Sequence, residues 1–76
     1  MTAPRQIVVA DKVVTLTPRQ IDVARCAADG YDVAGSAVVL GMAEKRVKKH
    51  RSALMAKLGV LTMICACVRL VREGVL

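Results

Sequence analysis

The residues with the clearest chemistry lie in one segment, Glu44 to Leu58, which holds six lysines and arginines together with His50. Cationic side chains at this density bind phosphate groups, both by charge and by hydrogen bonds from their nitrogens. The whole chain of 76 residues has 12 Lys and Arg against 6 Asp and Glu, a net charge of +6. This balance favours a polyanion as the binding partner, either nucleic acid or an anionic membrane surface.

On a helix, at about 100° per residue, this segment separates into two faces. Val47, Leu54 and Leu58 lie within about 40° of one direction, which we expect to face the core. The opposite face carries Lys45, Lys48, Lys49, Ser52 and Ala56, and His50 and Arg51 lie at the borders. A solvated basic surface is the simpler interpretation of such a run. The absence of acidic residues from the outer face, and its small Ser52 and Ala56, favour docking onto an anion and entry into the major groove of DNA.

Other classes of chemistry find little support. Tyr31 is the one aromatic residue, which argues against a single-strand binder that stacks bases. The sequence has no carboxylate pair, no nucleophile beside a base and no glycine-rich phosphate loop, so we do not expect an enzyme. The longest apolar stretch, residues 60–68, is much shorter than the ~20 residues of a membrane-spanning helix, and no membrane association is expected.

The three cysteines, Cys26, Cys65 and Cys67, indicate free thiols in a reducing cytoplasm, because their number is odd and no signal peptide precedes them. On a helix, Cys65 and Cys67 would point roughly 200° apart. No Cys-x-x-Cys pair or second histidine completes a ligand set, so we expect no metal and no cofactor.

The elements that must position the basic segment begin with residues 6–16, which hold two short β-branched runs around Asp11-Lys12 and predict a strand or hairpin. We treat residues 1–15 as an N-terminal arm. Thr17 is a natural N-cap, Pro18 suits the first helical position and Gln20 completes a capping box, so a helix is expected from Pro18 to about Asp29.

A second, short helix is expected over residues 33–40, capped by Asp32 and followed by a turn at Gly41. The basic helix, residues 44–58, then follows, and this order is typical of a helix-turn-helix. A fourth helix capped by Thr62 is expected to run to about Arg72. The fold class is therefore all-α, with four helices behind a β-prone arm.

These features resemble the LuxR-type, or GerE-type, helix-turn-helix domain of bacterial response regulators. The resemblance runs from Leu16 to Leu76 and rests on "LTPR", Gly30, "LG" at 40–41, "VKKHR" at 47–51 and "KLGV" at 57–60. It implies that residues 44–58 form the recognition helix and that the fourth helix is a dimer surface. The predicted base contacts are Lys45, Lys48, Lys49 and Ser52, and the predicted phosphate contacts are Arg46, His50, Arg51 and Lys57.

Several positions depart from the pattern of this family. It usually has Glu at the position of Gln20, a Ser or Thr cap at the position of Ala43 and a buried Ile at the position of Ser36. A missing cap costs about 1 kcal/mol, and a buried hydroxyl without a partner about 1 to 3 kcal/mol, so we expect a domain of low stability. The departures also leave unusual apolar residues, Val38, Val39, Leu61, Met63 and Val68, which either form an exposed partner site or are covered by small adjustments or by the N-terminal arm.

The sequence therefore predicts a stand-alone regulator, residues 16–76, that binds specific double-stranded DNA in a bacterial or phage cytoplasm. Because its apolar residues cover more than one stripe, the fourth helix is expected to form a homodimer. The predicted contacts are Met63, Ile64, Cys67, Val68 and Val71. The alternative is a protein-interaction module that binds RNA polymerase or another regulator.

Overall fold

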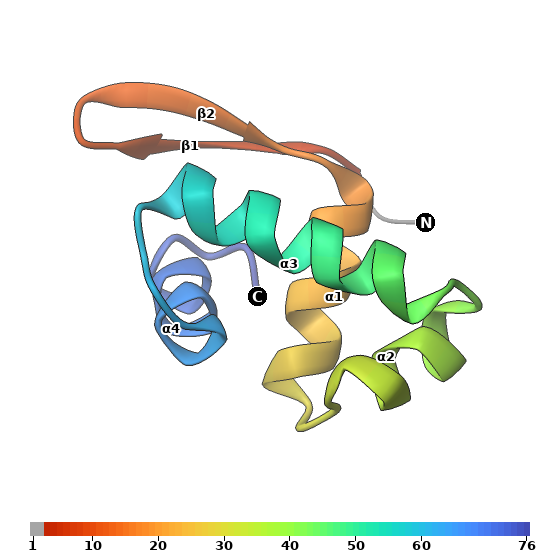
Figure 1. Cartoon of the computed structure of the whole chain (residues 1–76). Coiled ribbons are helices and arrows are strands. Elements are labelled where there is room, and N and C mark those ends of the chain that lie inside the picture. Colours follow the sequence, from red (N-terminus) through yellow and green to blue (C-terminus); the bar gives the residue numbers. More distant parts are fainter. Residues whose placement is uncertain (1–2) are drawn as a thin grey trace.

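The computed structural model describes residues 3–76, a β-hairpin followed by four helices (Figure 1). The elements are β1 (Arg5–Val9), β2 (Lys12–Leu16), α1 (Pro18–Ala28), α2 (Val33–Leu40), α3 (Glu44–Leu58) and α4 (Met63–Arg72). The four predicted helices are confirmed. The predicted class, all-α with a β-prone N-terminal arm, holds for the helical body, and the arm, for which a strand or a hairpin was predicted, is a two-stranded antiparallel hairpin.

The hairpin turn lies one residue before its expected position. Val9 pairs with Lys12, so the two-residue loop is Ala10-Asp11. Both loop residues have left-handed backbones, with φ of 49° and 64°, as the turns that match the twist of a hairpin require. Asp adopts this conformation readily, whereas the Cβ of Ala10 costs roughly 1–2 kcal/mol there. The sequence therefore carried no strong signal for this turn.

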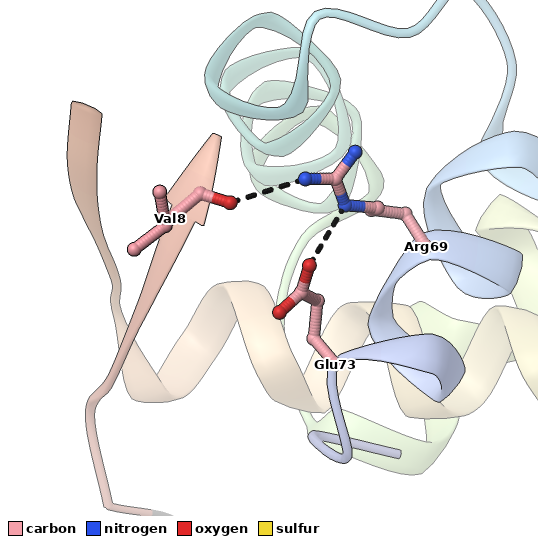
Figure 2. A network of polar contacts seen from close by, with 3 residues as sticks. All are labelled: Val8, Arg69 and Glu73. Atoms are coloured by element: carbon pink, nitrogen blue, oxygen red, sulfur yellow. Dashed lines mark hydrogen bonds and ion pairs between the residues drawn. The ribbon is translucent and has the colours of Figure 1, made fainter. Parts of the chain in front are cut away.

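Two cationic side chains hold the hairpin to the helices. Arg69 of α4 donates from Nη2 to the carbonyl oxygen of Val8 at 3.1 Å, and its Nε donates to Glu73 Oε1 at 3.1 Å (Figure 2). Lys57 of α3 donates from Nζ to the carbonyl oxygen of Thr15 at 2.6 Å. These bonds occupy one carbonyl on each strand, so the strands are connected to helices that lie more than 40 residues away in the chain.

The helix boundaries follow from the expected caps. Thr17 and Gln20 form the complete capping box, with Gln20 N donating to Thr17 Oγ1 at 3.2 Å and Thr17 N donating to Gln20 Oε1 at 3.0 Å. Asp32 caps α2, and Thr62 caps α4. Ala43 provides no side-chain cap for α3, as the sequence predicted.

The core consists of two separate clusters. The larger one joins the hairpin, α1, the carboxyl half of α3, α4 and the C-terminal tail: Ile7, Leu16, Ile21, Ala24, Leu54, Leu58, Ala66, Leu70 and Val75. The smaller one lies between α1, α2 and α3 and contains Val23, Ala37 and Val47. Ser36 is fully buried, and its Oγ has no hydrogen-bond partner among residues 3–76, so the expected defect of the core is present.

No single helix among residues 3–76 is long and apolar enough to cross a membrane. Only α3 and α4 taken together reach that length and composition, with a bend of 58° at the break between them.

Candidate nucleic-acid interface

The candidate interface is built on α3, whose inner side packs against the rest of the fold. Val47, Leu54 and Leu58 are buried, as the helical wheel predicted. The preceding turn ends α2 at Gly41, whose φ of 64° places it in the left-handed region that favours glycine. Met42 N then donates to the carbonyl oxygen of Ala37 at 3.1 Å, which fixes the direction in which α3 starts.

The outer side of α3 is a continuous polar face. Lys45, Lys48, Lys49 and Ser52 are all exposed, and so is Ala56. Within the part of the chain that the structure describes, none of these lysines forms an ion pair with a carboxylate. The face thus presents three ammonium groups and a hydroxyl. These groups donate hydrogen bonds, and they can bind either phosphate oxygens or the acceptor atoms of guanine.

One flank of this face gathers further positive charge from a second helix. His50 is half-buried, and its pKa is lowered first by burial and then by the charges of Arg46, Arg19 and Lys49. Arg19 lies in the first turn of α1, and its guanidinium lies 3.8 Å from the Asp22 carboxylate. Arg19 was not predicted as part of this face, because a helical wheel of residues 44–58 cannot identify a neighbour on another helix.

Two of the predicted phosphate contacts already have partners within the fold. Arg51 donates from Nη2 to the carbonyl oxygen of Tyr31 at 3.1 Å. Lys57, besides its bond to Thr15, donates to Gln20 Oε1 at 3.0 Å. Both side chains are half-buried, whereas Arg46 is exposed. The structure therefore brings Arg46 and His50 next to the lysine face and directs Arg51 and Lys57 to other segments.

The five α4 residues that were predicted as dimer contacts come together along one open groove of about 700 Å³. Its other side is formed by the end of α1 and the loop that follows it, including Ala27, Tyr31 and Asp32. Ile64, Val68 and Val71 expose 78%, 46% and 58% of their surface. Exposed aliphatic side chains that gather in one patch often mark a binding surface.

Two of the three thiols, Cys26 and Cys67, have pKa values raised by burial. Cys67 lies in the groove wall and its Sγ donates to the carbonyl oxygen of Ala24 at 3.6 Å, while burial raises its pKa. Burial also raises the pKa of Cys26, and the nearby Ser36 hydroxyl lowers it by a smaller amount. Cys65 is exposed. A raised pKa keeps a thiol protonated and weakens it as a nucleophile.

The other unusual apolar residues are mostly uncovered. Val38 and Val39 on α2 expose 83% and 53% of their surface, and Leu61 before α4 exposes 96%. Met63 is half-buried at the edge of the larger core cluster. The sequence left open whether these residues form an exposed partner site or are covered by small adjustments or by the N-terminal arm. In the described structure the hairpin covers neither Val38 and Val39 of α2 nor Leu61.

Comparison with known proteins gave one family. A family model described as "Bacterial regulatory proteins, luxR family" matches residues 14–69, which is well over half of the chain and includes α1, α2 and α3 entirely. A comparison with curated proteins gave no match.

Proposed function

The chain belongs to the luxR family of bacterial regulatory proteins, and from this premise we propose that it is a transcriptional regulator that reads double-stranded DNA with α3 in the major groove. The observation that carries the proposal is the outer face of α3, with three exposed lysines that no carboxylate neutralises within residues 3–76. A helix anchored on its inner side and cationic on its outer side is suited to this groove.

In this proposal Lys45, Lys48, Lys49 and Ser52 contact base edges, because they share the face that points away from the core. Arg46 and His50 contact the phosphates at the flank, and Arg19 adds a third group there. Arg51 and Lys57 were assigned to phosphates from sequence. Their hydrogen bonds to Tyr31 and Thr15 favour a different role for them, which is to hold α3 against the loop after α1 and against β2.

The experiment that tests base reading is a selection of bound fragments from random and genomic DNA, followed by affinity measurements on the recovered site and on unrelated DNA. Replacing Lys48 or Lys49 by Ala is expected to cost about 1 to 3 kcal/mol on the selected site and to relax the preference at one or two base pairs. Replacing Arg19 or Arg46 by Gln weakens both DNAs alike, because phosphate contacts carry no sequence information. Equal losses on the two DNAs for all four variants would contradict the assignment of base contacts.

We further propose that two copies associate through α4 when they occupy adjacent half-sites. The apolar wall of the groove supports this association. It consists of Met63, Ile64, Cys67, Val68 and Val71. Two-fold pairing lets a helix-turn-helix protein read half-sites about one turn of DNA apart. A Val68→Glu variant is expected to retain its helix content and to lose cooperative binding to a two-half-site DNA, measured by sedimentation and gel shift. A wild-type protein that remains a monomer on such DNA would rule out this arrangement.

A second candidate function is a protein-interaction module that binds RNA polymerase or another regulator. The exposed Val38, Val39 and Leu61 favour it, because they lie outside the α4 groove and DNA reading by α3 gives them no role. Loss of all sequence preference in the selection, with retained binding to purified RNA polymerase, would favour this candidate over the first.

A further inference from the structure

The groove beside α4 is not purely apolar, because a guanidinium lies in its wall. Arg51 of α3 enters the groove lining together with Tyr31, Met63, Ile64, Val68 and Arg72. The Arg51 Nη2 group is bonded to the Tyr31 carbonyl, but its Nε is buried and has no hydrogen-bond partner among the described residues. Because this Nε is closed to solvent, a group that docks in the groove meets the rest of the guanidinium, for which a carboxylate is the best-fitting acceptor.

The lining contains one acidic residue against two arginines. Its acidic residue, Asp32, uses Oδ1 to accept from Gly35 N at 2.8 Å and so caps α2. The exposed Arg72 adds a second positive charge to the same lining. The groove lining therefore combines an apolar floor with two guanidinium groups and one carboxylate, so its charge is positive on balance, and it complements a surface that is apolar with acidic residues at its sides.

A second copy of the chain matches only the apolar part of this groove. Its α4 would bring the same exposed Ile64, Val68 and Val71, but the α4 charge on this side is Arg72, because Arg69 is bonded to Val8 of the hairpin and to Glu73. In a two-fold contact the arginines of both copies would approach each other, and each copy carries a net charge of +6. Self-association through α4 is therefore weak without DNA to hold the copies together.

We infer that the groove is the docking site for an acidic amphipathic helix of a partner protein, which places aliphatic side chains along α4 and a carboxylate against Arg51. Helices bind such grooves through apolar anchors at i, i+3, i+4 and i+7, and flanking acids select the partner. A helix docked in an open groove buries its apolar side and leaves its other side in water. This inference rests on the proposed function, since the partner helix covers the residues proposed for dimerisation and so releases the protein from DNA.

The test uses a display library of 16-residue helical peptides with fixed leucine anchors and flanking positions that are randomised among Glu, Gln and Lys, selected on the full chain. Enrichment of Glu is expected, and the best peptide is expected to bind about tenfold more tightly than its Gln counterpart, which corresponds to one good charge-assisted contact. Val68→Glu abolishes this binding, and Arg51→Gln removes most of the preference for Glu over Gln. Lys48→Gln, a change of the same charge on the outer face of α3, leaves peptide binding unchanged.

Several results would overturn the inference: no enriched peptide, enrichment of Lys or Gln at the flanks, or binding that both groove variants retain. Circular dichroism of each variant separates loss of the groove from loss of the fold. The selected peptide is then added to the protein on its DNA site, where it is expected to reduce binding of the wild type. If the protein binds the peptide but selects no DNA sequence, the DNA-reading function is refuted while the assignment of the groove is supported. Failure of the proposed function and failure of this inference are therefore distinguishable.

Discussion

The two halves of this small domain are stabilised in different ways, although α1 and α3 run through both. The half that contains the hairpin and α4 has the larger cluster of nine buried residues, and the bonds from Lys57 and Arg69 reinforce it. The half that contains α2 and the start of α3 has a cluster of three, next to the buried hydroxyl of Ser36 and the uncapped Ala43. Helix α3 is therefore held mainly by its carboxyl half, while its lysines at positions 45, 48 and 49 lie over the weaker core.

This comparison implies that the helix-turn-helix half opens first. Local opening requires less free energy where few apolar contacts are broken, so the amides of α2 are expected to exchange hydrogen faster than those of α1 and α4. In the proposed binding mode the three lysines that contact DNA lie over the weaker half, and a ligand that binds the folded state stabilises it. The protein would then gain its full rigidity on its target.

The largest expected effect comes from a cavity in the stronger half. Leu70 is fully buried in the larger cluster, so Leu70→Ala is expected to cost about 2 to 5 kcal/mol, enough to unfold much of a domain of this size. Thermal unfolding followed by circular dichroism measures this. The matched control is Val71→Ala on the exposed side of α4, for which little change is expected. Similar losses for both variants would mean that α4 is not packed as described.

The weaker half offers a change in the opposite direction. Ser36→Ala removes a buried hydroxyl without a partner and should stabilise the protein by about 1 to 2 kcal/mol, part of it from the higher helix propensity of Ala. Ser52→Ala, on the exposed face of α3, measures the propensity part alone. If the two variants gain equally, the Ser36 hydroxyl is satisfied by the Cys26 thiol. Ser36→Ile, the residue that the family resemblance suggests, tests whether the surrounding core has closed around the smaller side chain.

A smaller gain is expected at the junction of the two halves. Gln20 is almost fully buried and its Oε1 accepts from both Thr17 N and Lys57 Nζ. Gln20→Glu keeps both acceptor contacts and makes the one to Lys57 an ion pair, which is expected to add about 1 kcal/mol to the free energy of unfolding near pH 7. The gain should be lost as the pH falls from about 4.3, the usual pKa of Glu, through the lower pKa of the paired carboxylate, and it should be absent in a Lys57→Met background. A loss of stability at pH 7 would show that desolvation of the new charge exceeds the attraction.

The sequence predicted the helices well because their boundaries depend on local chemistry. Thr17, Asp32 and Thr62 each cap a helix by bonding an amide three residues away, and such a signal is visible in a short window. The hairpin turn was placed one residue late, because Ala10 is an unusual residue for a left-handed position. Its strands were predicted from β-branched runs, but the cations that hold them, Lys57 and Arg69, are visible only in three dimensions.

The candidate site was predictable to the extent that it lies on one helix. A wheel of residues 44–58 separated the buried valine and leucines from the outer lysines correctly. It placed Arg51 at a border, and periodicity alone cannot say which neighbour a border side chain contacts. The contacts of Arg51 depend on other segments, because its guanidinium bonds to the Tyr31 carbonyl and lines the groove beside α4. Arg19 was missed for the same reason, since its link to His50 joins two helices.

The smallest expected effect is a pH dependence at the flank of the recognition face. Burial and the charges of Arg46, Arg19 and Lys49 lower the pKa of His50 below 6.5, its usual value. Between the folded-state pKa and 6.5 the unfolded chain binds more protons, so folding stability falls as the pH is lowered through this range and the loss is complete below the folded-state pKa.

A DNA phosphate beside His50 acts in the opposite sense, because it favours the imidazolium and raises the pKa of His50 in the complex. Affinity for DNA is therefore expected to rise as the pH falls from 7.5 towards 5.5, with uptake of a proton on binding, while the stability of the free protein declines. Denaturant titrations and DNA binding at constant ionic strength measure both slopes, and His50→Gln should flatten both. If the variant retains the wild-type slope for DNA, the proton is taken up elsewhere and His50 does not contact a phosphate.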